Sequence, residues 1–168
     1  MRTICYWLVS GVLLLAVACN PAPTTETTSA NKAAFATSGP DVDLLKKVME
    51  SFGKGDWVAY RSCFDDSAFS VYNEMATDAD IDRMPIDSAV AYHQRDREAL
   101  WEGMNSNTPI YEVVTDSTGA KYGHIWCKLT SKNRKTGKPV NVTIFSSVGF
   151  KNDKLAWEWV IYDSKKLD

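Results

Sequence analysis

The last third of the chain, residues 110–162, is a continuous series of strand-like segments, and it constrains the fold more than any other feature. Apolar and polar side chains alternate along these segments, which is the pattern of extended chain with two distinct faces. Short runs containing Gly, Asp, Asn or Pro separate them and have the composition of tight turns. We therefore predict an antiparallel meander of strands at 110–115, 121–132, 140–150 and 155–162.

The start of the domain has the apolar spacing of two consecutive helices. Apolar residues recur at helical intervals from 44 to 52, and Asp41 or Asp43 can cap the helix that they define. Gly55 ends this helix. A second, shorter helix is expected to begin at Asp56 and to carry Tyr60 on its apolar side.

A third helix is predicted from Ser88 to about Met104, again from the spacing of its apolar residues. This places Trp101 near its end and His93 on the helix surface. Between the second and third helices, Ala68–Tyr72 is expected to be a short strand and 73–87 an acidic loop. Helices followed by a strand meander define an α+β fold, with one sheet packed on three N-terminal helices.

The first 18 residues have the marks of a secretory signal peptide. Arg2 is the only charged residue among them, and residues 4–18 form an apolar run that ends on small side chains. This run is shorter than the roughly 20 residues that a membrane-spanning helix needs. We predict that residues 1–18 are removed on export.

The segment Leu15–Cys19 resembles the lipobox of bacterial lipoproteins, although Ala16 occupies the position where leucine is most common. This resemblance implies that Cys19 becomes the first mature residue and carries a lipid, which anchors the protein to a membrane of the cell envelope. Residues 19–40, rich in Thr, Ala, Ser and Pro, are then a flexible linker, and 41–168 form one domain. The expected location is the periplasmic or extracellular face of that membrane.

Charge and motif content exclude several classes of function. The chain has 19 basic and 21 acidic residues, and removal of the signal peptide takes away Arg2. The mature protein then has a net charge of about −3, which argues against general nucleic-acid binding. The sequence contains no Gly-rich phosphate loop and no Cys or His spacing typical of a metal site. We therefore expect neither a metal nor a cofactor.

Both faces of the predicted strands are largely apolar. In the closing strand, Trp157, Trp159 and Ile161 point to one side, whereas Val160 and Tyr162 point to the other. The helices can cover only one face of the sheet, so a second copy of the chain is expected to cover the other. The sequence thus predicts a homodimer through the outer sheet face.

Several short motifs together resemble the nuclear transport factor 2-like superfamily, in its SnoaL-like branch. They occur in the order and spacing of that fold and extend over nearly all of the domain: Val48–Trp57, Cys63–Phe69, Thr136–Pro139, Phe150–Leu155 and Trp159–Asp163. The resemblance implies a cone, in which a strongly curved antiparallel sheet wraps over three helices and leaves a pocket at one end. Members include isomerases, cyclases, a hydrolase, a dehydratase and pure binding proteins, so the fold alone does not fix the function.

The residues that ketosteroid isomerase, one member of the superfamily, requires are missing. That enzyme stabilises an enolate with a tyrosine and a protonated aspartic acid, and it moves the proton with an aspartate. Alignment on the shared motifs puts Val48, Val71 and Ser146 at these three positions. That specific reaction is therefore not expected.

The same alignment turns Ser146, Glu158 and Tyr162 into the pocket, and we favour an inward orientation of His124 and Trp126 on their strand. Glu158 is then a carboxyl group among aromatic rings with a raised pKa, and His124 could share a proton with it. The alternatives are a Glu158 that is solvated or paired with a lysine near the sheet end, and a His124 with a structural role.

The orientation of the strand that carries His124 also decides whether the two cysteines of the domain, Cys63 and Cys127, can meet. They either form a disulfide or serve as small buried apolar residues. An inward His124 turns Cys127 outward, out of reach of Cys63 beneath the sheet. A bond between them would require the opposite orientation of that strand.

Two hypotheses about function follow. The first is a non-catalytic, lipid-anchored binding module that holds a small apolar or amphipathic ligand, or a protein partner, at the envelope. The second is an isomerase, cyclase or hydrolase that uses Glu158 and His124 as acid and base. The candidate ligand contacts, for whose aromatic members core packing is the alternative, are Ser146, Tyr162, Trp126, Tyr60 and Trp101.

Overall fold

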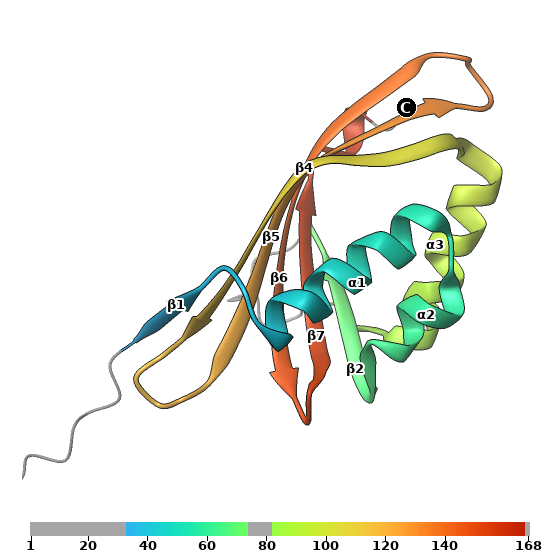
Figure 1. Ribbon diagram of the computed structural model, residues 1–168. Helices are drawn as coiled ribbons and strands as arrows, with labels where there is room; N and C mark the ends of the chain where they lie inside the picture. Colours follow the sequence, from blue (N-terminus) through green and yellow to red (C-terminus); the bar gives the residue numbers. More distant parts are fainter. Residues whose placement is uncertain (1–32, 74–81, 167–168) are drawn as a thin grey trace, which may run out of the picture.

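The long strands form one strongly bent sheet, and the helices lie on its concave side (Figure 1). The computed structural model describes residues 33–73 and 82–166, so the predicted signal peptide, Cys19 and most of the linker lie outside the described residues. The helices are α1 (Pro40–Lys54), α2 (Trp57–Ser62) and α3 (Ile86–Leu100), with a final 3-10 turn η1 (Ser164–Lys166). The strands are β1 (Ala34–Ala36), β2 (Phe64–Tyr72), β3 (Met84–Pro85), β4 (Trp101–Thr115), β5 (Lys121–Asn133), β6 (Pro139–Lys151) and β7 (Lys154–Tyr162).

The sheet is mixed, which corrects the expectation of antiparallel pairing throughout. Its strand order is β1-β4-β5-β6-β7-β2-β3, with β2 parallel to β7 and the other neighbours antiparallel. The meander β4 to β7 pairs as predicted. Strand β2 runs the other way because a helix and the whole meander separate it from β7 along the chain, and such long connections permit parallel neighbours. The predicted α+β cone is confirmed in its architecture.

Strand β1 lies within the segment predicted to be linker. Ala34 pairs with Thr115 and Ala36 with Val113 along the outer edge of β4. Phe35, between them, is exposed. The paired chain therefore starts before residue 41. No helix among the described residues is both long and apolar enough to cross a bilayer.

The ends of the first two helices follow local chemistry. Gly39 precedes α1 without any side-chain cap, and Pro40 occupies the first turn, where its missing N–H costs nothing. Asp41 therefore lies in the first turn, beside the positive end of the helix dipole, rather than at the cap. Gly55 closes α1 in the left-handed conformation, and the side chain of Asp56 accepts a hydrogen bond from the backbone of α2, as predicted.

The third helix ends at Leu100, so the prediction that it continues to Met104 was wrong. Residues from Trp101 onward pair with β5 instead, and two register shifts bend β4 as it passes over the helices. Gly103 and Thr108 lie at these shifts with positive φ angles of 64° and 46°. Pairing with a long neighbouring strand thus overrides the helical spacing of the apolar residues.

Strand β5 presents the opposite face to the one we favoured. Gly123, Ile125 and Cys127 point inward, whereas His124 and Trp126 lie on the outer face. A Cβ atom on residue 123 would lie 2.9 Å from a methyl group of Leu45, so only glycine lets α1 approach this closely. Although Cys127 points inward, Cys127 and Cys63 are both buried free thiols, which agrees with the small-apolar alternative.

Packing between α1 and the sheet is tight at its centre. The side chains of Leu45, Phe64, Ile86 and Leu155 are almost completely enclosed, and Val148 closes the layer from β6. Burying such a side chain contributes roughly 1.5–3 kcal/mol. This part of the cone is therefore solid, and any open space lies farther along the strands.

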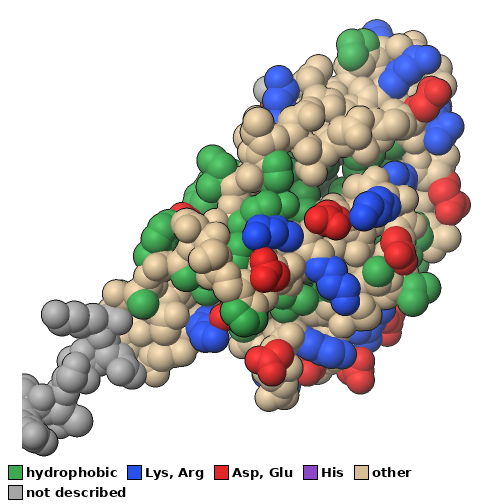
Figure 2. All heavy atoms as spheres, in the orientation of Figure 1, with side chains coloured by type: hydrophobic (Ala, Val, Ile, Leu, Met, Phe, Trp, Pro, Cys, Tyr) green, Lys and Arg blue, Asp and Glu red, His purple; other side chains and the backbone are tan. Residues whose placement is uncertain are grey.

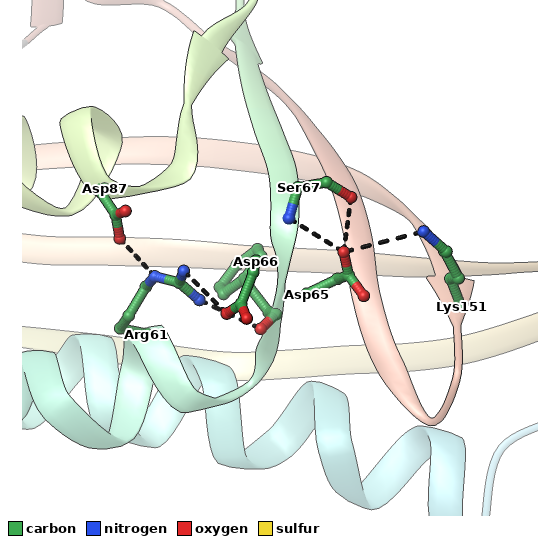
Figure 3. A network of polar contacts seen from close by, with 7 residues as sticks. Arg61, Asp65, Asp66, Ser67, Asp87 and Lys151 are labelled. Atoms are coloured by element: carbon green, nitrogen blue, oxygen red, sulfur yellow. Dashed lines mark hydrogen bonds and ion pairs between the residues drawn. The ribbon is translucent and has the colours of Figure 1, made fainter.

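A polar network at the start of β2 joins several elements (Figure 3). Arg61 on α2 pairs with Asp87 at the start of α3 and with Asp66 on β2 at 3.3 Å. Asp65, the neighbouring residue, lies 3.9 Å from Lys151 at the end of β6. Exposed ion pairs contribute little to stability individually. They link α2 to α3 and to β2 at the surface.

Replacement of Gly149 by alanine tests the packing of the outer face. A Cβ atom on Gly149 would lie 2.1 Å from Nε1 of Trp157, whose ring covers this position on the adjacent strand. The ring must move, so we expect Gly149→Ala to lower the free energy of unfolding by roughly 1–3 kcal/mol in urea denaturation. Gly53→Ala is the control, because its Cβ meets nothing within 4 Å. Equal effects of the two substitutions would contradict this packing.

Candidate ligand cavity

A cavity of about 130 Å³ opens between the helices and the bent part of the sheet. Its walls are mainly apolar and come from three α-helices and five strands, namely α1, α2, α3, β2, β4, β5, β6 and β7. The space-filling view shows apolar side chains in the gap between the charged helix surfaces and the long strands (Figure 2). The apolar wall residues include Val48, Phe52, Ile125, Leu129, Val142 and Val148.

Glu158 is the most deeply buried carboxyl group of this cavity, at 4% exposure. The hydroxyl of Ser70 donates to Oε1 of Glu158 at 2.6 Å. The hydroxyl of Tyr60 lies 3.2 Å from both carboxyl oxygens, and that of Tyr72 lies 3.3 Å from Oε1. Three hydroxyl groups thus surround a carboxyl group that water hardly reaches.

Strand register brings these groups together from distant parts of the sequence. The parallel pairing of β2 with β7 sets Ser70 beside Glu158 and Tyr72 beside Val160. Tyr60 reaches the same carboxyl group from α2, where it is also buried. The site therefore depends on a strand pairing that the sequence did not predict.

Burial raises the pKa of Glu158 above its ordinary value, since desolvation penalises the charged form. Hydrogen bonds from Ser70, Tyr60 and Tyr72 act in the opposite direction without cancelling this effect. Burial, and then the nearby Glu158, raise the pKa values of Tyr60 and Tyr72, so both hydroxyls keep their protons. The group is an acid in a low-dielectric site, held by neutral donors.

His93 is the second titratable group at this end of the cavity. The hydroxyl of Tyr72 lies 2.8 Å from Nε2 of His93, and the rings of Phe52 and Tyr60 pack against the imidazole edge to face. Burial lowers the pKa of His93 to about 4, so the ring is neutral at pH 7. Tyr72 therefore lies between Glu158 and His93 and can hydrogen bond with either of them.

Charged residues occur on α3 toward the mouth of the cavity. The guanidinium of Arg97 donates to the carbonyl oxygens of Phe52 at 2.8 Å and Gly53 at 2.7 Å, where it caps the end of α1. Asp96 is paired with the exposed Arg95 at 3.1 Å. These groups have partners of their own, whereas Glu158 lies deeper and is held by hydroxyls.

Most of the predicted ligand contacts line the cavity. They come from four different elements, and the structure gathers them around the same space as Glu158. The predicted residues that line it are Ser146, Tyr162, Tyr60 and Trp101, together with Glu158 itself. Trp101 does so from the start of β4 rather than from a helix.

His124 and Trp126 do not belong to the cavity, which corrects both assignments. Nδ1 of His124 lies 3.0 Å from the carboxylate of Glu112 on the neighbouring strand of the outer face. Trp126 is 37% exposed there and packs against Phe145, with ring centroids 5.0 Å apart. Their strand faces the other way because Gly123 must face α1, so neither side chain can reach Glu158.

Three residues of the site were missed, namely Ser70, Tyr72 and His93. His93 had a signal in the sequence, since it falls at helical spacing from the apolar residues Val90 and Leu100. Ser70 and Tyr72 alternate with Val71 on β2, so one face of that strand is polar. Nothing in the sequence says that this face meets Glu158.

Among the described residues, no group of three His, Cys, Asp or Glu side chains is arranged to hold a metal ion. The polar groups around Glu158 are the hydroxyls of Tyr60, Ser70 and Tyr72, and Tyr72 also contacts the imidazole of His93. This arrangement can bind a small molecule and exchange a proton with it.

Solved structures of known proteins are similar to the chain over most of its length. IdmH from Streptomyces antibioticus, a candidate polyketide cyclase, is 15% identical, with a TM-score of 0.60 over 76% of this chain and 94% of that one. A candidate polyketide cyclase from Xanthomonas campestris pv. campestris is 11% identical, with a TM-score of 0.62 over 78% and 96%. A protein with a ketosteroid isomerase-like fold from Catenulispora acidiphila, solved in complex with trimethylamine, is 10% identical, with a TM-score of 0.56 over 74% and 88%.

The domain therefore has the nuclear transport factor 2-like fold that the motifs implied. The sequence itself matches no family model and no curated protein. At identities this low the similarity shows the fold, and that fold carries many different functions. What the cavity does has to be argued from the residues of this chain.

Proposed function

We propose that this protein is a small-molecule receptor of the bacterial cell envelope, anchored by a lipid at Cys19, whose cone binds one apolar or amphipathic molecule. The observation that carries the proposal is the buried carboxyl group of Glu158 in a cavity with mainly apolar walls. Burying a carboxyl costs free energy that folding alone does not require. A ligand-binding role accounts for that cost.

The surroundings of Glu158 support this role. An apolar pocket with a few polar groups at defined positions is the usual form of a small-molecule site, in which the walls supply affinity and the polar groups supply orientation. Here Ser70 and Tyr60 fix the carboxyl group, and Ser146 and Tyr162 add hydroxyls along the wall. Candidate polyketide cyclases and a trimethylamine complex occur among proteins of the same fold.

A thermal-shift screen of small apolar molecules with a single polar group tests the proposal. We expect hits that raise the midpoint of unfolding in a concentration-dependent manner, because they bind the folded state only. Substitution of Val142 by tryptophan, which fills the cavity from the β6 side, is expected to abolish those shifts. Hits that survive this substitution would show binding elsewhere and would refute the proposed cavity.

A second candidate function, proton-transfer catalysis in an isomerase or cyclase, is favoured by one contact. Tyr72 lies 3.3 Å from Glu158 and 2.8 Å from His93, so a proton can pass between acid and imidazole through its hydroxyl. His93 thereby replaces His124 as the basic partner. Turnover of any hit from the screen, lost in both Glu158→Gln and Tyr72→Phe, would favour this candidate over pure binding.

Membrane anchoring through Cys19 leads to a clear expectation for the full-length protein. When the chain is expressed in a bacterium, the Cys19→Ala variant should carry no acyl chain, whereas stable anchoring needs two or more. It should therefore leave the lipid-anchored membrane fraction and appear as soluble protein or as uncleaved precursor. Incorporation of a labelled fatty acid should be lost at the same time. Cys63→Ala is the matched control, since that thiol is buried in the domain. Labelling that persists in Cys19→Ala would contradict the anchor.

Pairing of two copies through the outer sheet face is part of the same proposal. Adjacent residues of four strands form an apolar row there: Ile110, Trp126, Phe145 and Ile161. We expect Trp126→Lys to convert a dimer into a monomer in light scattering, since a charge in the row opposes burial. Val58→Lys, at an exposed apolar position on α2, is the control. A monomeric wild type would refute the pairing.

A further inference from the structure

Five aromatic rings form a continuous wall on one side of the cavity. His93 is at its centre, with its ring centroid 5.1 Å from that of Phe52, 6.1 Å from Tyr60, and 5.6 Å from both Tyr72 and Tyr92. All five side chains line the cavity. The faces of aromatic rings are electron-rich, so a wall of this kind attracts a cation that carries apolar substituents.

The cavity has no available cation of its own among the described residues that line it. Arg97 is the only permanently charged basic side chain there, and it donates to the carbonyl oxygens of Phe52 and Gly53. His93 is neutral near pH 7 because burial holds its pKa at about 4. An anionic ligand would therefore find no free positive charge inside the cavity.

Two acidic side chains line the cavity, and only one of them forms an ion pair with a basic residue among those described. Asp96, toward the mouth, pairs with the exposed Arg95. Glu158, at the floor, is bonded to hydroxyl groups alone among the described residues. Glu158 is therefore the most deeply buried ionisable acid of the cavity. When it ionises, its negative charge lies beside the aromatic wall.

One oxygen of Glu158 has spare capacity as an acceptor. Oε1 is within hydrogen-bond distance of Ser70, Tyr60 and Tyr72, whereas Oε2 is near only the shared hydroxyl of Tyr60 at 3.2 Å. A carboxylate oxygen can accept about two hydrogen bonds. Oε2 can therefore accept from an N–H group of a ligand without displacing the hydroxyls.

We propose that the ligand is a small protonated amine with apolar substituents, bound with its nitrogen at Oε2 of Glu158 and its carbon groups against the ring wall. This inference rests on the proposed small-molecule role of the cavity and names the chemical class of ligand. A volume of about 130 Å³ sets the size, because apolar cavities of roughly 150 Å³ accept a six-membered ring. The ligand thus carries about one ring or a short branched chain.

Binding is coupled to proton release. Desolvation raises the pKa of Glu158, and the titratable groups that face it among the described residues are Tyr60, Tyr72 and, beyond Tyr72, His93. An ammonium ion favours the carboxylate form of Glu158, so any proton that the carboxyl group carries leaves to solvent on binding. The products are the ammonium–carboxylate pair and one free proton, so mass and charge balance.

Isothermal titration of the detergent-solubilised full-length protein with three ring compounds of equal size tests this inference. The probes are cyclohexylamine, cyclohexanol and cyclohexanecarboxylate at pH 7. We expect the amine to bind at least tenfold more tightly than the alcohol, and the carboxylate to bind more weakly than either. Repeating the amine titration from pH 5 to pH 8 in buffers of different ionisation enthalpy should show proton release that grows as pH falls, which the alcohol should not show.

Variants separate the charge from the rings. Glu158→Gln should remove the preference for the amine and its proton release while the alcohol still binds. Phe52→Leu, which keeps the charge but removes one ring, should weaken the amine more than the alcohol and supplies the same test if the Gln variant does not fold. Equal affinity of amine and alcohol in the wild type would overturn the amine assignment and leave the cavity as a binding site. Failure of all three probes to bind would overturn both the assignment and the proposed function.

Discussion

Replacement of Glu158 by glutamine is expected to make the protein progressively more stable relative to wild type as pH rises. Desolvation raises the pKa of this carboxyl group in the folded state, so the folded protein holds the proton more tightly than the unfolded chain does. The stability of wild type is then greatest below the ordinary pKa of glutamate and is lost as pH rises toward the raised value. Glutamine has a similar shape and nothing to ionise.

The measurement is urea denaturation of both proteins from pH 4 to pH 9. The difference in unfolding free energy should grow in favour of the variant with a slope of up to about 1.4 kcal/mol per pH unit, which corresponds to one proton. Glu98→Gln, an exposed substitution on α3, corrects for the general loss of a negative charge. If wild type instead became more stable relative to Glu158→Gln as pH rises, the pKa of Glu158 would be lowered on folding. The hydrogen bonds from Ser70, Tyr60 and Tyr72 would then have a larger effect on that pKa than burial has.

The Glu158→Ala substitution is expected to lower stability, in contrast to Glu158→Gln. Removal of the whole carboxyl group leaves the hydroxyls of Ser70 and Tyr60 without their acceptor, and each unsatisfied buried group costs roughly 1–3 kcal/mol. The alanine variant should therefore lose stability across the pH range. Together the two variants separate the cost of the charge from the value of the hydrogen bonds.

The sequence predicted Glu158 because strand alternation is a local property. Once Tyr162 and Val160 are assigned to one face, Glu158 must share it, and the structure places all three along the cavity. The partners of Glu158 are a different matter. Ser70 meets it only through the pairing of β2 with β7, strands separated by most of the domain, and no local pattern encodes that contact.

His124 shows that the alternation of side chains along a strand does not predict which face of the strand is buried. Alternation says that His124 and Ile125 face opposite sides, but it does not say which side is inside. The residue that decides this is Gly123, where α1 packs so closely that a side chain has no room. A glycine in the interior of a long strand marks the close approach of another element, and that signal would have oriented β5 correctly.

The boundary between α3 and β4 could not be read from spacing for a related reason. Trp101 and Met104 continue the apolar period of the helix, yet they line the cavity from an extended strand. Pairing with β5 begins at Trp101, and it supplies partners for the backbone groups that a further helical turn would otherwise have paired. Long-range pairing of this kind lies outside any short window of sequence.

His93 leads to the second large effect, which lies at acidic pH. Burial lowers the pKa of its imidazole to about 4, below the ordinary value of 6.5, so the unfolded chain takes up a proton before the folded protein does. The stability that the neutral ring provides is present above pH 6.5 and is lost as pH falls through about 4. Over that range wild type should lose up to about 3 kcal/mol of unfolding free energy through this residue.

Substitution of His93 by glutamine should remove this loss while preserving an acceptor for the hydroxyl of Tyr72. The two proteins are compared by urea denaturation from pH 7.5 to pH 4, and His124→Gln removes the only other histidine of the chain, on the outer face. The variant should be the less stable protein at pH 7.5, because the rings of Phe52 and Tyr60 lose their partner, and the more stable one near pH 4. Parallel pH profiles of wild type and His93→Gln would mean that water reaches the imidazole in the folded state. In that case the ring wall would be open to solvent, and neither the neutral histidine nor the proton path through Tyr72 could stand.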